Sequence, residues 1–155
     1  MDCDGVLTDG GMYYAESGDE WKKFNTRDGK GVELLRRAGY LTAIITGEDT
    51  VIVARRAAKM KIDVLLQGIT DKLSALENVL TEHGLECSQV AYVGDDLGDL
   101  EVMERVGLAC AVADAVDAVR QVADYVCEKQ GGQGAVREVA DLILARRGRE
   151  DEEAA

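Results

Sequence analysis

Two clusters of carboxylates carry the chemistry that this sequence could perform. Asp2 and Asp4 are separated by one residue, and a second acidic run contains Asp95, Asp96 and Asp99. Side chains at positions i and i+2 of an extended segment lie on the same side, so Asp2 and Asp4 face one site. A metal-bound carboxylate beside one that can hold a proton suits covalent phosphoryl transfer, with Asp2 as nucleophile and Asp4 as general acid and then base.

The position of the two clusters predicts a metal ion between them. Both lie where the sequence predicts the ends of strands, and ligands of a parallel α/β sheet bind beyond the carboxyl ends of its strands. Carboxylates that converge at such an edge repel one another unless a cation neutralises them. An all-oxygen ligand set of this kind suits Mg²⁺, which we therefore expect as the cofactor.

Two further residues complete a predicted phosphate site. Thr46 follows an apolar run and precedes Gly47, so it offers a hydroxyl group together with exposed backbone N–H groups. Lys72 begins an expected helix and can place its ammonium group on phosphoryl oxygens. Electrostatic stabilisation by such donors is usually the largest catalytic contribution in phosphoryl transfer. Each motif alone also occurs as a solvated turn or a helix cap, and it is their combination that indicates chemistry.

The elements that must position these residues alternate between short apolar runs and amphipathic stretches. This alternation is typical of an α/β fold with a doubly wound, mostly parallel sheet. We expect strands at 40–46, 64–66, 90–93, 108–112 and 125–127. We expect helices at 51–61, 72–83, 100–106, 117–123 and 135–145. A β-hairpin is expected at about 11–24, where the aromatic side chains form either core or an assembly surface.

Length and charge limit the domain count and the partners. The 155 residues suit one domain, which we expect to span 1–148, followed by a disordered acidic tail at 149–155. The formal net charge of −12, without a run of Lys or Arg, argues against nucleic acid or an anionic membrane as a partner. We find no apolar stretch of the ~18 residues that a membrane span needs. Four scattered cysteines are typical of reduced thiols in a cytoplasm.

The order of these motifs resembles the haloacid dehalogenase superfamily of aspartyl phosphatases. More closely, it is similar to the capless branch that includes 3-deoxy-D-manno-octulosonate 8-phosphate phosphatase. The resemblance runs from Asp2 to about Leu144, and it includes the more specific runs 24–29, 90–96 and 131–138. It implies a Rossmann-like domain with an inserted hairpin and no cap domain.

The resemblance also implies roles for the acidic residues. Asp2 would be the nucleophile and a Mg²⁺ ligand, and Asp4 would be the acid and base that binds the metal through its backbone carbonyl. Asp95 would be the third protein ligand of the metal. Asp96 and Asp99 would hold these metal ligands in position without binding the metal themselves.

Further positions match the family's substrate site and its assembly. Thr46 and Lys72 would hold the phosphoryl group, with Gly47 beside them. The substrate would also be lined by Asn25, Thr26, Arg27, Asp28 and Gly29. The family is tetrameric, so the resemblance implies a homotetramer in which the hairpins form a central barrel and neighbouring subunits replace the missing cap.

Three residues bear on the length of the substrate. Glu48 stands where the octulosonate 8-phosphate enzymes usually carry an arginine, and Lys59 follows on the next expected helix. This pair resembles the phosphatases of nine-carbon acids such as 2-keto-3-deoxy-nononate 9-phosphate. Arg56 matches a family position that meets the substrate of a neighbouring subunit. We therefore expect a sialic-acid-like 3-deoxy-ulosonic sugar phosphate, with octulosonate 8-phosphate or a non-catalytic tetramerisation module as the alternatives.

Other classes of protein fit the sequence less well. A phospho-accepting receiver domain uses similar groups, but its acidic pair comes first and its lysine last, whereas here the run 94–99 follows Lys72. A cysteine phosphatase needs an arginine six residues after its cysteine, and none of the four cysteines has one. Family members carry an apolar run before the nucleophile, and here only Met1 precedes Asp2. We therefore expect the natural protein to begin several residues earlier.

Overall fold

Parallel strands form the centre of the fold, in two groups that the first two residues join. The computed structural model describes the main chain of residues 1–153 and the side chains of residues 1–148. One group pairs β3 (Ala43–Ile45) with β4 (Val64–Leu66). The other pairs, in this order, β5 (Ala91–Gly94), β6 (Leu108–Ala111) and β7 (Tyr125–Val126).

Residues 1–2 lie between β3 and β5 and are hydrogen-bonded to both. The carbonyl of Met1 accepts from the N–H of Ile45 at 3.0 Å, and its amino group donates to the carbonyl of Ala43 at 3.1 Å. On the other side, the N–H of Asp2 donates to the carbonyl of Val93 at 3.1 Å. Asp2 therefore stands at the middle of the combined sheet, at the edge where β3 and β5 end.

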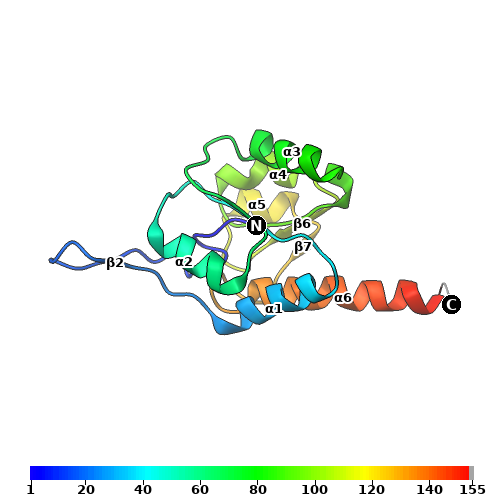
Figure 1. Cartoon of the computed structure of the whole chain (residues 1–155), viewed down its shortest axis with the longest axis horizontal. Helices are drawn as coiled ribbons and strands as arrows, with labels where there is room; N and C mark the ends of the chain where they lie inside the picture. The colour runs from blue at the N-terminus through cyan, green and yellow to red at the C-terminus, as the bar shows by residue number, and fades with distance from the viewer. Residues whose placement is uncertain (154–155) are drawn as a thin grey trace.

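Helices cover both faces of this sheet (Figure 1). On one side lie α3 (Lys72–His83) and α4 (Leu100–Met103), and α5 (Asp117–Val122) packs beside α4. On the other side α1 (Thr26–Arg37) lies along α6 (Ala135–Glu153), and α2 (Val51–Met60) packs beside α1. Two short 3₁₀ helices, η1 (Cys87–Gln89) and η2 (Leu97–Asp99), flank β5. This is the doubly wound α/β fold that the sequence predicts.

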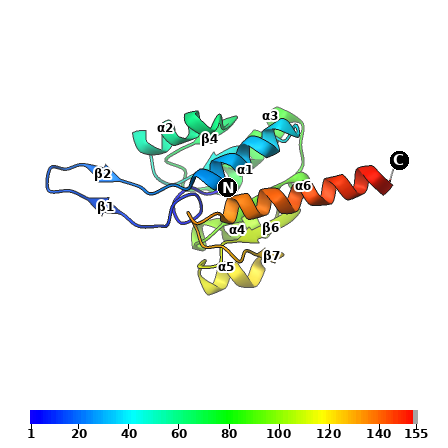
Figure 2. The same ribbon diagram turned by 90° about the horizontal axis from the view of Figure 1, so that it is seen from below.

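A two-stranded antiparallel hairpin stands away from this body (Figures 1 and 2). It consists of β1 (Tyr13–Tyr14) and β2 (Glu20–Trp21), with Tyr13 opposite Trp21. Tyr14 is 72% and Trp21 65% exposed, so neither belongs to the core of this chain. At the base of the hairpin an antiparallel bridge joins Thr8 to Phe24.

Helix α1 differs from the expectation, because no helix was predicted at 26–37. Gly29 and Gly31 lower the helical propensity of this segment, which hides it from a pattern search. Its first turn is capped by the Asn25 side chain, which accepts from the N–H of Arg27 at 2.9 Å. Gly31 also allows close packing on α6, since a Cβ there would lie 2.9 Å from the Cα of Arg137. Packing against α6 thus outweighs the weak local propensity.

The end of the chain also differs from the expectation. Residues 149–153 continue α6 rather than beginning a disordered tail, and their Glu-rich composition is compatible with a helix. Residues 154–155 lie outside the described part of the chain. None of the helices within residues 1–153 combines the length and the apolar character that a membrane crossing requires.

Candidate active site

The two acidic clusters meet at the edge of the sheet where the strands end. Asp2 lies in the first two residues, which are hydrogen-bonded to β3 and β5, and Asp95 directly follows β5. Asp2, Asp95 and Asp99 each offer a carboxylate oxygen within 4.8 Å of the others. The loop after Asp2 lies against Asp95, since a Cβ on Gly5 would be 2.0 Å from Oδ2 of Asp95. Only glycine allows the two motifs to approach this closely.

Asp99 holds this cluster together through hydrogen bonds that occupy both of its oxygens. Its Oδ1 accepts from Nζ of Lys72 at 2.8 Å and from the hydroxyl of Tyr92 at 2.7 Å. Its Oδ2 accepts from the N–H of Asp95 at 2.9 Å. Lys72 also lies 3.0 Å from Oδ2 of Asp2. Asp99 therefore positions Lys72 and the Asp95 loop. The sequence analysis did not identify Tyr92, whose hydroxyl also binds Asp99.

Asp95 keeps a carboxylate oxygen that a cation could bind. Oδ1 of Asp95 is buried and has no hydrogen-bond partner among the described residues. A buried carboxylate oxygen without a partner costs free energy unless a proton or a cation meets it. The donor set consists of oxygen atoms, which fits a hard divalent cation. The exposed Asp96 instead accepts from the N–H of Leu97 at 2.7 Å and caps η2.

Burial and crowding shift the protonation of this cluster. Desolvation, with the charges of Asp2 and Asp99, raises the pKa of Asp95 to about 8. Desolvation and the Asp99 charge also raise the pKa of Asp2, although Lys72 opposes them. Burial lowers the pKa of Lys72, but its two carboxylate neighbours outweigh burial and raise that pKa overall. Lys72 therefore remains charged, and the carboxylates need a cation to be charged together.

Cys3, between the two aspartates, is not a nucleophile. Its side chain is fully buried. Burial first, and then the charges of Asp4 and Asp2, raise the pKa of its thiol to about 12. A thiol at this pKa stays protonated at neutral pH and attacks poorly. The chemistry of this loop therefore falls to its carboxylates.

Thr46 is held at the same edge by the loops around it. It follows β3 directly and is 1% exposed. Its N–H donates to the carbonyl of Leu66, and its carbonyl accepts from the N–H of Ile69, both at 3.0 Å. The Thr46 N–H is therefore not the free donor that the sequence suggested. Its hydroxyl and the exposed Gly47 are the groups left to meet a phosphoryl oxygen.

Asp4 has a partner that the sequence analysis missed. Nζ of Lys22, which follows β2, lies 2.7 and 2.8 Å from the two carboxylate oxygens of Asp4. The same Nζ lies 3.4 Å from Oε2 of Glu48. Desolvation lowers the pKa of Lys22, but its contacts with Asp4 and Glu48 raise that pKa overall. Nothing in a single sequence distinguishes Lys22 from its neighbour Lys23.

The segment expected to line the substrate is partly structural. Asn25 caps α1, and its amide group donates to the carbonyl of Gly132 at 3.3 Å. Asp28 is fully buried, and its Oδ1 accepts from the N–H of Arg137 at 3.0 Å, in the first turn of α6. These two residues tie α1 to α6 and to the loop before it. Thr26 and Arg27 are exposed, and Gly29 is half-buried.

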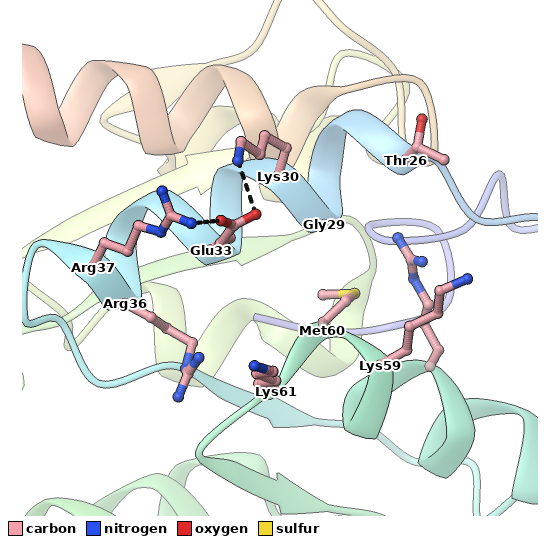
Figure 3. A pocket seen from close by; sticks show the side chains of 10 residues that line it. Thr26, Gly29, Lys30, Glu33, Arg36, Arg37, Lys59, Met60 and Lys61 are labelled. Carbon is pink, nitrogen blue, oxygen red and sulfur yellow. Dashed lines mark hydrogen bonds and ion pairs between the residues drawn. The ribbon is translucent and has the colours of Figure 1, made fainter.

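Arg56 and Lys59 line a basic groove between α1 and α2 (Figure 3). The groove has a volume of about 760 Å³. Its cationic side chains are those of Lys30, Arg36, Arg37, Arg56, Lys59 and Lys61. Arg56 donates to the carbonyl of Asn25 at 2.8 Å and stacks 5.4 Å from the ring centre of Phe24. Glu48 lies outside this groove and contacts Lys22, with 3.4 Å between Nζ and Oε2.

This fold and site define a hydrolase of the haloacid dehalogenase class. Residues 48–139 match the family model of haloacid dehalogenase-like hydrolases. The 3-deoxy-D-manno-octulosonate 8-phosphate phosphatase of Escherichia coli (strain K12) is 47% identical over 152 residues, covering 98% of this chain and 81% of that protein.

Two crystal structures extend the likeness. A probable YrbI family phosphatase from Pseudomonas syringae has a TM-score of 0.93 and 50% identity, covering 99% of this chain and 87% of that one. The 3-deoxy-D-manno-octulosonate 8-phosphate phosphatase of Moraxella catarrhalis, in complex with magnesium ion, phosphate ion and KDO, has a TM-score of 0.91 and 43% identity, covering 94% of this chain and 83% of that one. This chain belongs to the 3-deoxy-D-manno-octulosonate 8-phosphate phosphatase family, and it is a phosphatase of the haloacid dehalogenase type.

In the metal-free protein, the free energy of unfolding should depend on whether Asp95 is charged. Because the pKa rises from 3.8 to about 8 on folding, the protonated carboxyl favours the folded state below pH ~4. That contribution is lost as the pH rises through about 8. With a chelator present near pH 9, Asp95→Asn should therefore unfold at a higher urea concentration than the parent, because its free energy of unfolding is higher by about 1 kcal/mol or more. Near pH 4 the two proteins should unfold at similar urea concentrations.

A distant exposed carboxylate supplies the control for this measurement. Asp117→Asn, whose side chain on α5 is 85% exposed, should unfold at the same urea concentration as the parent near pH 9. Parallel stability curves for Asp95→Asn and the parent would show that Asp95 does not carry a raised pKa.

Proposed function

We propose that this protein hydrolyses 3-deoxy-D-manno-octulosonate 8-phosphate to the free sugar acid and phosphate, with Mg²⁺ as its cofactor. The observation that carries the proposal is the meeting of Asp2, Asp95 and Lys72 at one edge of the sheet. The choice of substrate rests on two relatives. The E. coli protein is named for this ester, and the M. catarrhalis structure contains magnesium, phosphate and KDO. These relatives favour the eight-carbon substrate over the nine-carbon preference drawn from Glu48 and Lys59.

Each residue of the site has its own role in the proposed reaction. A carboxylate oxygen of Asp2 attacks phosphorus, the bond from phosphorus to the sugar oxygen breaks, and Asp4 gives that oxygen a proton. Asp4 then takes a proton from the water that cleaves the aspartyl phosphate. Lys72, 3.0 Å from Asp2, and the Thr46 hydroxyl would hold the phosphoryl oxygens. Asp2, Asp95 and the Asp4 carbonyl would hold Mg²⁺, which when bound offsets the negative charge of the nucleophile and the phosphoryl group.

The hairpin and the basic groove support a homotetramer. The hairpin exposes Tyr14 and Trp21 away from the body, and exposed aromatic side chains of this kind are enriched in interfaces. The groove that contains Arg56 and Lys59 suits an anion, such as the carboxylate of a sugar acid in a neighbouring subunit. We therefore propose that a neighbour completes each site, in place of a cap domain.

Replacement of the nucleophile tests the covalent mechanism. Asp2→Asn should lower kcat for octulosonate 8-phosphate by at least ~10⁴-fold, because an amide cannot form the aspartyl phosphate. Phosphate release with and without Mg²⁺ measures this loss, and the parent should lose its activity in a chelator. Asp117→Asn, on the exposed face of α5, is the matched control and should keep full activity. Substantial turnover by Asp2→Asn would exclude the covalent route.

Substrate choice can be read from the ratio of two rates. The kcat/KM of the parent should be at least ~10-fold higher for octulosonate 8-phosphate than for 2-keto-3-deoxy-nononate 9-phosphate. Glu48→Arg, which restores the cation usual in the eight-carbon enzymes, should raise this ratio further, and Glu48→Gln should change it less. A parent that prefers the nine-carbon ester would overturn the choice of substrate and leave the phosphatase chemistry intact.

A charge on the hairpin should disrupt the tetramer. Trp21→Glu places a carboxylate where the assembly would bury an aromatic ring, so sedimentation velocity should show smaller species than the parent forms. Val126→Glu, at an exposed position of β7, is the control and should sediment as the parent does. A tetramer that survives Trp21→Glu at micromolar concentration would place the interface elsewhere.

A further inference from the structure

A lysine at the base of the hairpin is buried although the reaction described above does not use it. The side chain of Lys22 is 0% exposed, whereas that of the adjacent Lys23 is 57% exposed. Lysine is almost never fully buried without a partner, because its charge loses its water. The contacts of Lys22 therefore show what keeps it in place.

Those contacts are to the carboxylates of Asp4 and Glu48. Nζ lies 2.7 and 2.8 Å from the two oxygens of Asp4, and 3.4 Å from Oε2 of Glu48. Hydrogen bonds between charged groups are shorter and stronger than neutral ones. A donor that bridges both oxygens also fixes the rotation of the carboxylate plane. Lys22 therefore holds Asp4 in one orientation.

No other described side chain holds Asp4 in this way. The hydroxyl of Thr8 lies 3.5 Å from Oδ1 of Asp4, at the limit of a hydrogen bond. That hydroxyl already accepts from the N–H groups of Gly5 and Gly10, at 3.1 and 3.2 Å. The Asp4 side chain is 25% exposed, so it has room to turn toward solvent. Without Lys22 its orientation would be poorly determined.

We propose that Lys22 is a positioning residue for Asp4, a role that rests on the proposed function of Asp4 as acid and base. A carboxylate has about four lone-pair positions, so the bonds to Lys22 leave others for the ester oxygen and for water. Asp4 gives its proton to the sugar oxygen as the bond to phosphorus breaks, and it regains one from the attacking water. Lys22 keeps its own protons throughout and acts on the proton transfer only through Asp4.

The leaving group separates this role from a merely structural one. A sugar alcohol is a poor leaving group and needs the proton of Asp4, whereas p-nitrophenolate leaves without one. Lys22→Met should therefore lower kcat/KM for octulosonate 8-phosphate by roughly 10²-fold, the lower end of what general acid–base catalysis contributes. This ratio reports the formation of the aspartyl phosphate and not its hydrolysis, in which Asp4 acts as a base for both substrates. With p-nitrophenyl phosphate, the loss in kcat/KM should be only a few-fold. Lys22→Arg, which keeps a cationic donor, should recover part of the loss.

The adjacent lysine supplies the control, and a second variant guards against misfolding. Lys23→Met removes a lysine of the same strand end, and its two rates should match those of the parent. Lys22→Gln keeps a hydrogen-bond donor without charge, and its ratio of the two rates decides the question if Lys22→Met does not fold. All assays use the full chain with Mg²⁺, and thermal unfolding is measured beside them.

Three results would overturn the proposal. The first is an equal loss of kcat/KM on both substrates, which would mean that Lys22 only maintains the fold or the metal site. The second is unchanged turnover of the sugar acid phosphate by both Lys22→Met and Lys22→Gln. The third is a parent protein that hydrolyses neither ester, which would overturn the proposed function itself and is seen before any variant is made.

Discussion

Repulsion between carboxylates at one edge of the sheet is the constraint on which the rest of this structure depends. Asp2, Asp95 and Asp99 lie within 4.8 Å of one another, and their negative charges disfavour the fold unless something opposes them. Lys72 opposes part of this charge, and desolvation together with the remaining negative charge raises the pKa of Asp95 to about 8. The fold accepts this cost at the point where a divalent cation and a phosphoryl group can be bound, so the instability and the chemistry have the same origin.

The surrounding elements keep these charges in place by short-range contacts. Met1 and Asp2 are hydrogen-bonded to β3 and β5, which sets Asp2 at the centre of the sheet. Gly5 allows the loop after Asp2 to reach Asp95. Tyr92 and Lys72 then meet on Asp99 from β5 and α3. Each contact restrains a different element, and together they make a rigid site from segments distant in the sequence.

Local pattern and motif order predicted the sheet and the acidic clusters well, because each strand and each acidic motif consists of residues that are close together in the sequence. The strand at 64–66 and the helix at 72–83 have the expected bounds. Helix α1 was missed, because Gly29 and Gly31 conceal a helix that packing on α6 stabilises. Lys22 was missed for a related reason, since its significance arises from a contact with Asp4 across a separation of 18 residues. Such contacts leave no trace in local composition.

The hairpin has a mechanical consequence that follows from the geometry of a strand. Side chains of successive residues in an extended strand project to opposite sides. Trp21 is directed to solvent while Lys22, the next residue, is enclosed against Asp4 and Glu48. A single peptide unit therefore connects the outer surface of the hairpin to the lysine that contacts Asp4, so a tilt of the hairpin would be transmitted to that contact.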